Sequence, residues 1–376
     1  MPKVLCLSCN TGGGHNAAGR AIQETFEKNG ISCSFQDLLA LAGEKISGRV
    51  EQTYLSSTRV PKVFGLLYKA GDVISSNRYK SPIYWANRIY RDRVYNFIME
   101  HDFDAVVMPH LFPAETITSL RREGRLSIPA IAIATDYTCI PFWEETECDY
   151  YVIPHPDLLE EFAGKGIPKE KLLPYGIPVR PEFGMKRDPM QAKQALGLEQ
   201  DRPFYLVMSG SMGFGNLETL VEAVLQREGS QVNLAVVCGT NQPLASVLKE
   251  RFGEYSNVRI EGYTTEIPLY MAACDVIFTK SGGLTSTEAA VRGCALIHTS
   301  PIPGCETKNA LFFQGKGMSF YSEEVKEQAE YAHRLCWEPK LREAMHKAQK
   351  ENMFPDAAQR VCDLVIRMCE RKESVK

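Results

Sequence analysis

The chain alternates short apolar runs with stretches in which hydrophobic residues recur at helical spacing. Each run is nearly free of charge, which is typical of a strand buried on both faces of a parallel sheet. The runs fall at residues 4–9, 31–35, 104–109, 130–135, 150–153 and 172–179 in the first half, and at 204–209, 232–238, 258–260, 276–278 and 294–298 in the second. Helical patterns follow most of them, so the order predicts an α/β protein.

The alternation occurs twice, and each half begins with a strand, a glycine-rich loop and a helix. At 376 residues the chain also exceeds a comfortable single domain. We therefore expect two Rossmann-like, doubly wound domains that face a cleft. The expected parts are an N-terminal domain at 1–185, a C-terminal domain at 186–350 and a last helix at 351–376 that packs back on the N-terminal domain. Surface helices are expected at 331–350 and 357–371.

One segment, about 37–100, interrupts the alternation. Between positions 59 and 93 it carries eight basic and only two acidic residues, interleaved with aromatic ones. Amphipathic helices of this kind suit an anionic membrane surface, and single-stranded nucleic acid would use similar chemistry. A solvated insertion whose aromatics face the core is the plain alternative. We favour membrane or acceptor docking, through Lys62, Tyr84, Trp85, Arg88 and Arg91.

Composition limits where the protein acts. Hydrophobic residues make up 44% and charged residues 24% of the chain, as in soluble globular proteins. The formal net charge of −3 gives no global attraction to nucleic acid, and we expect no nucleic-acid partner. The twelve cysteines, several of them inside apolar runs, indicate reduced thiols. No signal peptide or membrane-spanning run is evident, so we expect a cytoplasmic protein with peripheral membrane contact.

The first strand leads into Thr11-Gly12-Gly13-Gly14-His15, and a helical pattern begins at Asn16. The glycines permit a close backbone approach to a ligand, although their spacing matches neither the dinucleotide fingerprint nor a Walker loop. His15 would sit at the positive end of a helix dipole, which disfavours its protonation. It is therefore a candidate general base, or else a surface histidine that caps a turn.

A second stretch, 279–309, joins two strand ends. The run at 276–278 stops at a Gly282-Gly283 turn before a helix that carries Glu288, and Glu306 and Asn309 follow the next strand. Backbone N–H groups at a helix start can bind phosphate, and open α/β sheets bind ligands at this edge. The turn by itself is an ordinary βα connection, but together with the acidic residues it indicates a nucleotide-sugar site.

These motifs, taken together, resemble a family of GT-B glycosyltransferases. The family is that of monogalactosyldiacylglycerol synthases and processive diacylglycerol glucosyltransferases, related to the peptidoglycan enzyme that adds N-acetylglucosamine to lipid I. The resemblance covers nearly the whole chain. The matching motifs are residues 11–15, 135–137, 176–178, 210–213, 279–285 with 288–289, and 303–304 with Glu306 and Asn309.

The resemblance implies an inverting transfer of a hexose from UDP-glucose or UDP-galactose to a diacylglycerol-type lipid, at the inner face of the cell membrane and without a metal or other cofactor. His15 and Asp136 would be catalytic. Glu288 would hold the ribose, and Glu306 and Asn309 would face the hexose and the phosphates. The complete set of expected donor-binding residues is Gly13, Gly14, Ser211, Gly213, Gly262, Tyr263, Gly282, Gly283, Leu284, Thr285, Glu288, Glu306 and Asn309.

The chain departs from the family pattern at three positions. The family usually has Pro where Ser281 stands, Gln where Cys305 stands, and a His three residues before the Trp where Ile140 stands. A nucleotide-sugar epimerase, which shares the two-domain architecture, and a non-catalytic UDP-sugar sensor are the alternatives to a transferase.

Overall fold

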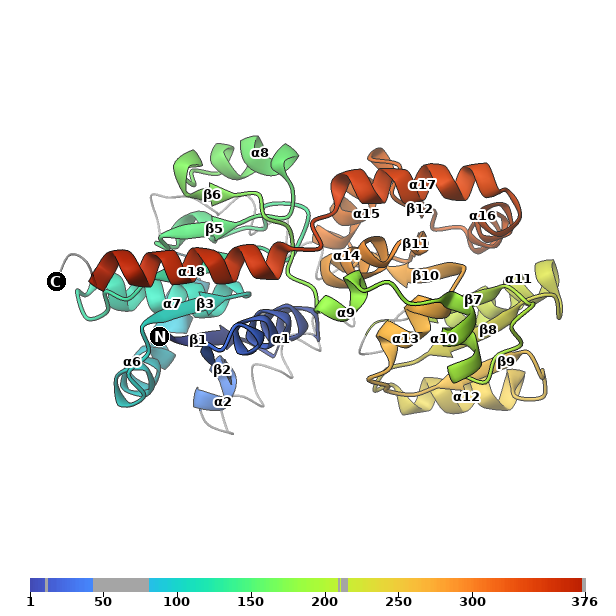
Figure 1. The fold of residues 1–376 in the computed structure, drawn as a ribbon, viewed down its shortest axis with the longest axis horizontal. Coiled ribbons are helices and arrows are strands. Elements are labelled where there is room, and N and C mark those ends of the chain that lie inside the picture. Colours follow the sequence, from blue (N-terminus) through green and yellow to red (C-terminus); the bar gives the residue numbers. More distant parts are fainter. Residues whose placement is uncertain (11–12, 43–80, 209, 211–215, 374–376) are drawn as a thin grey trace. The chain divides into compact units, whose positions relative to one another are not determined.

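The computed structural model describes residues 1–10, 13–42, 81–208, 210 and 216–373 (Figure 1). The chain forms two compact units. Unit 1 comprises Met1–Pro181, Pro303–Cys305 and Phe354–Lys376, and unit 2 comprises Glu182–Ile302 and Glu306–Met353.

Unit 1 is built on a six-stranded parallel sheet in the order β2-β1-β3-β4-β5-β6. Its strands are β1 (Lys3–Ser8), β2 (Ser32–Asp37), β3 (Ala105–Met108), β4 (Ala130–Ile133), β5 (Tyr150–Val152) and β6 (Leu172–Leu173). The central strands β3 and β4 are buried at every position, as a parallel sheet covered on both faces requires.

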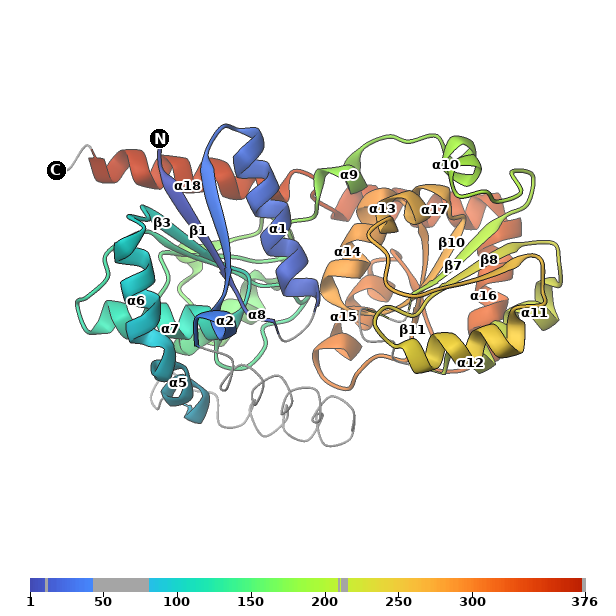
Figure 2. The ribbon, with the colours of Figure 1, turned by 90° about the horizontal axis from the view of Figure 1, so that it is seen from below.

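Helices cover both faces of this sheet (Figure 2). The α-helices are α1 (Gly13–Lys28), α2 (Leu38–Ala42), α5 (Pro82–Asn87), α6 (Arg91–Glu100), α7 (Leu111–Arg122), α8 (Leu159–Gly164) and α18 (Ala357–Glu373). Single 3₁₀ turns are η1 (Arg88–Tyr90), η2 (Trp143–Glu145), η3 (Pro156–Leu158) and η4 (Lys169–Lys171), and α9 (Pro181–Gly184) lies at the boundary between the units.

The last helix belongs to the core of unit 1. Val361 and Val365 of α18 are fully buried in one cluster with Ile22 of α1 and with Val4 and Val107 of the sheet. A segment at the far end of the sequence therefore completes the hydrophobic core of the first unit. It comes there because only a helix with an apolar face can cover the remaining part of that sheet face.

Unit 2 repeats the architecture with another parallel sheet, in the order β12-β11-β10-β7-β8-β9. Its strands are β7 (Phe204–Met208), β8 (Asn233–Val237), β9 (Val258–Glu261), β10 (Val276–Lys280), β11 (Ala295–Thr299) and β12 (Phe320–Tyr321). Its helices are α10 (Pro189–Ala195), α11 (Leu217–Glu228), α12 (Gln242–Phe252), α13 (Ile267–Ala273), α14 (Gly283–Arg292), α15 (Cys305–Gly315), α16 (Val325–Trp337) and α17 (Pro339–Asn352).

Three boundaries differ from the sequence expectation. Helix α1 begins at Gly13 instead of Asn16, so His15 lies inside its first turn. Helix α15 begins at Cys305, so Glu306 and Asn309, which the sequence placed only after the strand, lie within a helix. The single helix expected at 331–350 is two helices, because Pro339 cannot donate the hydrogen bond that would continue α16 and instead starts α17.

All twelve cysteines are free thiols, and most are buried. In the described part of the chain, no helix combines the length and the apolar character needed to cross a membrane.

Candidate functional site

The first candidate site lies where the strand order of unit 1 reverses. From β1 the chain passes to β2 on one side, and β3 pairs with β1 on the other. In open α/β sheets the loops at such a point diverge and leave room for a ligand at the carboxyl ends of the strands. His15 follows β1, His110 follows β3, and Asp136 follows β4. We call these three residues, with Pro109 and Thr135, the histidine site.

Hydrogen bonds fix the tautomer of His15. Its Nδ1 lies 2.9 Å from the carbonyl oxygen of Pro109 and 2.9 Å from the Thr135 hydroxyl. A carbonyl oxygen can only accept a hydrogen bond, so Nδ1 carries the proton. In the neutral ring the lone pair is then on Nε2, which is the atom able to take a proton from a ligand.

Burial keeps this ring neutral. Removal from water lowers the pKa of His15 below its ordinary value, while the Asp136 carboxylate and the Pro109 carbonyl oppose that shift. The sequence argument for a neutral His15 invoked the helix dipole, whereas the structure adds desolvation as a cause. The result is a neutral base with a carboxylate nearby that stabilises the imidazolium once it forms.

His110 is a site residue that the sequence argument missed. Its ring packs edge-to-face on His15 with the centroids 4.5 Å apart, and its Nδ1 accepts the Phe112 N–H at 3.0 Å. Burial, and secondarily His15, holds the pKa of His110 well below its ordinary value. The signal was present, because Pro109 and His110 directly follow a buried strand.

The second candidate site lies at the corresponding reversal in unit 2, between β7 and β10. The turn after β10, Lys280–Gly283, leads into α14 with Gly282 as the N-cap. The first N–H groups of a helix have no carbonyl partner within it, and they face the positive end of the dipole. We call this turn, with Gly210, Glu306 and Asn309, the glycine-turn site.

Side chains of α15 brace the turn. The Ser281 hydroxyl donates to the Glu306 main-chain oxygen at 2.6 Å, and the fully buried Asn309 amide donates to the Ser281 carbonyl at 3.0 Å. Proline, the usual residue of the family at position 281, has no hydroxyl to make the first bond. The Asn309 amide therefore supports the backbone of the turn. The contact of Asn309 with the sugar nucleotide that the resemblance implies stays a prediction.

Lys280 is a second residue to which the sequence argument gave no role. Its ammonium forms an ion pair with Glu306 Oε1, and the other carboxylate oxygen accepts the Ile302 N–H at 2.9 Å. Both oxygens of Glu306, which was expected to face a hexose, are thus held by the protein. The signal for Lys280 was its place as the last residue of β10, directly before the glycine turn.

The remaining donor residues of the sequence prediction fall in several places. Leu284 and Glu288 are buried on α14, and Thr285 is half-buried beside them. Gly13 and Gly14 lie in unit 1, in the first turn of α1.

Two of the predicted donor residues lie away from the glycine turn. Gly262 and Tyr263 follow β9, which β7 and β8 separate from β10, and Tyr263 is 69% exposed. Ser211 and Gly213 lie outside the described residues.

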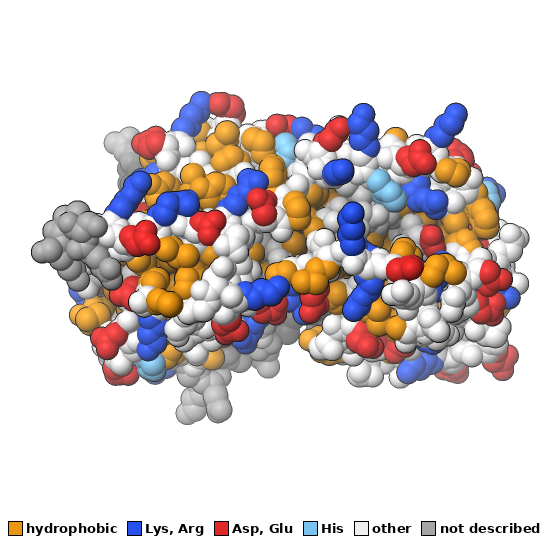
Figure 3. Space-filling view, viewed as in Figure 1, with side chains coloured by type: hydrophobic (Ala, Val, Ile, Leu, Met, Phe, Trp, Pro, Cys, Tyr) orange, Lys and Arg blue, Asp and Glu red, His pale blue; other side chains and the backbone are white. Residues whose placement is uncertain are grey.

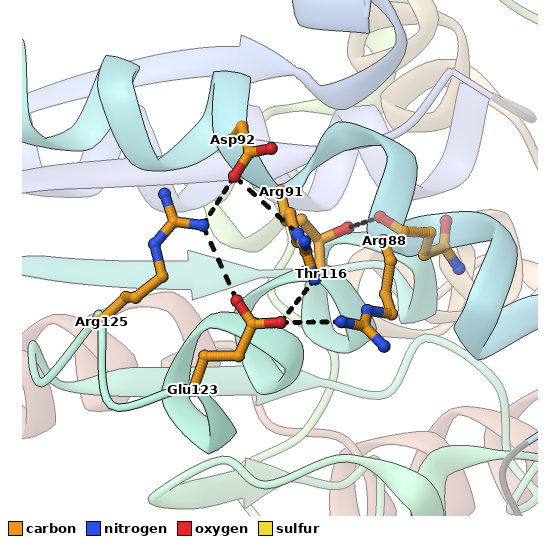
Figure 4. Close-up of polar contacts among 7 residues, drawn as sticks. Arg88, Arg91, Asp92, Thr116, Glu123 and Arg125 are labelled. Carbon is orange, nitrogen blue, oxygen red and sulfur yellow. Dashed lines mark hydrogen bonds and ion pairs between the residues drawn. The ribbon is translucent and has the colours of Figure 1, made fainter.

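In the described part of the expected membrane segment, two arginines are paired with a carboxylate from outside the segment. The Arg88 guanidinium contacts Glu123 at 2.8 Å, and Arg91 pairs with the same carboxylate (Figure 4). Tyr84 is 5% exposed, so it belongs to the core, whereas Trp85 is 56% exposed. The charge count over 59–93 missed Glu123 because that residue lies outside the window, at the C-cap of α7.

Lys62 lies outside the described residues. Within the described ranges, no three His, Cys, Asp or Glu side chains are grouped so that they could hold a metal ion.

Solved structures share this fold. The chain aligns with MurG of Acinetobacter baumannii at a TM-score of 0.63 and 16% identity, over 98% of this chain and 100% of that one. It aligns with the UDP-GlcNAc 2-epimerase of Neisseria meningitidis, solved bound to UDP-GlcNAc, at a TM-score of 0.64 and 14% identity, over 97% and 100%. At sequence identities this low, the similarity to these structures shows only a shared fold, which is GT-B.

Family models match both halves. Residues 15–179 match the monogalactosyldiacylglycerol (MGDG) synthase model, and residues 204–361 match the C-terminal domain of glycosyltransferase family 28. The chain is also 27% identical to the processive diacylglycerol beta-glucosyltransferase of Bacillus mycoides (strain KBAB4), over 97% of this chain and 93% of that protein. With its two halves matched by these two models, the chain is a GT-B glycosyltransferase that combines an MGDG synthase domain with a family 28 C-terminal domain.

Proposed function

We propose that this glycosyltransferase moves a hexose, first of all glucose, from a UDP-sugar to the hydroxyl of a diacylglycerol-type lipid with inversion at the sugar carbon. The observation that carries the proposal is the neutral His15 with its free Nε2, inside the domain that matches the MGDG synthase family. Relatives that span nearly the whole chain are named processive diacylglycerol beta-glucosyltransferases, which favours this acceptor and this sugar.

At the histidine site, Nε2 of His15 takes the proton of the acceptor hydroxyl as the oxygen attacks the sugar carbon. The proton on Nδ1 stays between the Pro109 carbonyl and Thr135, which keeps the ring oriented. Asp136 stabilises the positive charge that develops on the ring. Attack from the face opposite to the leaving group gives inversion in one displacement.

At the glycine-turn site, the departing UDP develops negative charge. N–H groups at the start of α14 face that charge without needing to reorganise, which lowers the barrier. Gly282, Gly283, Leu284 and Thr285 supply this part of the site. Ser211 and Gly213, which lie outside the described residues, are predicted to contribute as well. Glu288 takes the ribose. No metal ion is needed in this scheme.

The lipid acceptor requires a membrane. We propose that the protein binds peripherally to the inner face of the cell membrane, with the exposed Trp85 of α5 among its contacts.

The test is UDP release from UDP-glucose and UDP-galactose, with and without diacylglycerol in anionic vesicles. We expect release that depends on the lipid, is faster with UDP-glucose and yields a glycolipid. An isomerised UDP-sugar without lipid would instead support an epimerase, the activity of a protein with the same fold. UDP binding without any turnover would support a sensor.

A further inference from the structure

The Lys280 side chain lies between Gly210 and Gly282, two glycines at the strand reversal of unit 2. Gly210, in the loop after β7, has φ +75°, and a Cβ there would come within 2.6 Å of Lys280 Cε. A Cβ on Gly282, the N-cap of α14, would lie 3.8 Å from Lys280 Nζ. A Cβ at position 210 would push the lysine stem aside, and the positive φ also favours glycine there. In the present arrangement the ammonium group lies beside Gly282, where α14 begins.

Glu306 holds that ammonium in the absence of a ligand. The side chains of Lys280 and Glu306 are 22% and 9% exposed, so solvent screens the pair only in part. Glu306 is anchored independently, because its Oε2 accepts the Ile302 N–H. Loss of the lysine contact would therefore leave the carboxylate in place, with Oε1 free.

We propose that Lys280 and Glu306 form a donor-responsive ion pair. The diphosphate of the sugar nucleotide takes the Lys280 ammonium from Glu306, and the freed Oε1 then accepts a hydrogen bond from a hydroxyl of the hexose. This inference rests on the proposed function and adds Lys280 to it as the cation that meets the diphosphate. It also explains how Glu306 faces a hexose although both its oxygens are engaged in the ligand-free protein.

The exchange follows from charge. A diphosphate carries more negative charge than one carboxylate, and the helix start adds its own positive field at the same place. Without a donor the lysine would otherwise be a partly buried, unpaired cation, which is unfavourable. Glu306 removes that cost, but it also competes with the diphosphate for the same ammonium.

Because Glu306 and the diphosphate compete for the Lys280 ammonium, substitutions of Lys280 and of Glu306 should change UDP affinity in opposite directions. Lys280→Met should weaken UDP binding roughly ten- to hundredfold, because a charge-assisted contact is lost. Glu306→Gln should strengthen it roughly three- to tenfold, because a competing negative charge is removed. Lys280→Arg should stay within about threefold of the parent protein. Glu306→Gln should nevertheless slow transfer, since a neutral amide binds the sugar hydroxyl less well.

The experiment is calorimetric titration of the full-length protein and these variants with UDP, together with glucose transfer rates from UDP-glucose. Lys326→Met, at an exposed lysine on α16 of the same unit, is the matched charge control and should bind UDP as the parent does. Thermal unfolding followed by circular dichroism establishes that each variant is folded.

Weaker UDP binding in Lys280→Met together with tighter UDP binding in Glu306→Gln would support the inference. Weaker UDP binding in both variants would make the pair a structural brace and overturn it, as would unchanged binding in Lys280→Met. If the parent protein binds and uses UDP-glucose while the variants fail this pattern, only the ion-pair inference falls. If the parent binds no UDP at all, the proposed donor falls and the inference falls with it.

Discussion

The proton on the ring of His15 decides what the histidine site can do. Its Nδ1 is committed to the Pro109 carbonyl and Thr135, so only Nε2 is available for proton transfer. Burial keeps the ring neutral, and Asp136 makes its protonation less unfavourable. His15 and Asp136 are therefore arranged as a base and its stabilising carboxylate. His15 comes from the first turn of α1, and Asp136 follows β4.

His15→Ala should lower the transfer rate by roughly 10²–10⁴-fold, the usual contribution of a positioned base. UDP affinity should hardly change, because the glycine-turn site is built in the other unit. Lipid-dependent UDP release and calorimetric UDP titration measure the two quantities. A variant that transfers at the normal rate would remove His15 from the mechanism.

Asp136→Asn should alter the pH profile as well as the rate. The reaction needs the neutral His15 ring, so activity falls as pH drops through the pKa of that ring. Asp136 raises this pKa, so its removal should move the acid limb of kcat/KM to lower pH. The rate on the plateau should fall by roughly tenfold, because the imidazolium loses its stabilising charge. An acid limb that stays in place would contradict the coupling of the two residues.

The position of α14 depends on a buried histidine of the neighbouring strand. His298 of β11 lies between two hydroxyls, with Nε2 2.9 Å from Ser286 Oγ on α14 and Nδ1 3.1 Å from Ser319 Oγ. Its side chain is fully buried, and burial lowers its pKa to about 3. The helix that begins at the glycine turn is thus tied to the sheet by a neutral ring.

His298 should make unit 2 sensitive to acid. In the unfolded chain the ring protonates near its ordinary pKa of about 6.5, whereas the folded state keeps it neutral down to about pH 3. Protonation of this residue therefore costs no stability above about pH 6.5. Between about pH 6.5 and about pH 3 the free energy of unfolding falls, by up to about 1.4 kcal/mol per pH unit. Urea unfolding at several pH values should show that the free energy of unfolding falls less steeply with decreasing pH in His298→Gln than in the parent protein. An equal slope in both proteins would argue against this role.

The α5–α6 region should meet a membrane through its exposed tryptophan more than through its arginines. The Arg88 guanidinium lies 4.9 Å from the centre of the Trp85 ring, and Glu123 offsets its charge. Trp85→Ala should reduce binding to anionic vesicles severalfold without lowering the unfolding temperature, because the ring is largely exposed.

Tyr255→Ala is the matched control for Trp85, since Tyr255 is a half-exposed aromatic residue of unit 2. Vesicle co-sedimentation measures both variants. An equal loss of vesicle binding in the two variants, or no loss in Trp85→Ala, would show that the α5–α6 region has a structural role and does not bind the membrane through Trp85.

The two units differ in how the chain builds them. Figure 3 shows hydrophobic side chains, with basic and acidic ones among them, on the face of unit 1 that carries α18. Beneath that surface, α18 contributes Val361, Cys362 and Val365 to the core of the first sheet. Unit 1 therefore needs both ends of the sequence, whereas the elements of unit 2 run almost continuously from Glu182 to Met353.

A fragment of residues 1–181 should fail to fold, because it exposes the sheet face that α18 covers. A fragment of residues 182–353 should fold cooperatively and bind UDP. Circular dichroism and gel filtration of the two fragments test this. A stable, monomeric fragment 1–181 would show that α18 is dispensable for the first core.

Much of the architecture could be predicted from the pattern of apolar runs. Buried parallel strands are nearly continuous apolar segments, so β1, β3, β4, β7, β8 and β10 stand out without any tertiary information. The family assignment was also within reach, because glycine turns and polar residues at strand ends recur at readable spacing. The two-residue strand β12 was missed, whereas β6, equally short, was found because it begins the longer apolar run at 172–179.

The side-chain pairings were decided by tertiary structure. Partners such as Arg91 with Glu123, or His15 with the Pro109 carbonyl, are far apart in sequence, and only strand order brings them together. A window of sequence could count the positive charges of η1 and α6, but it could not include the Glu123 carboxylate, which follows α7. The sequence by itself determined which segments are buried strands and which loops carry polar groups, because burial depends on local apolar content. Which ring nitrogen of His15 is free, and which cation holds Glu306, depended on distances across the folded sheet.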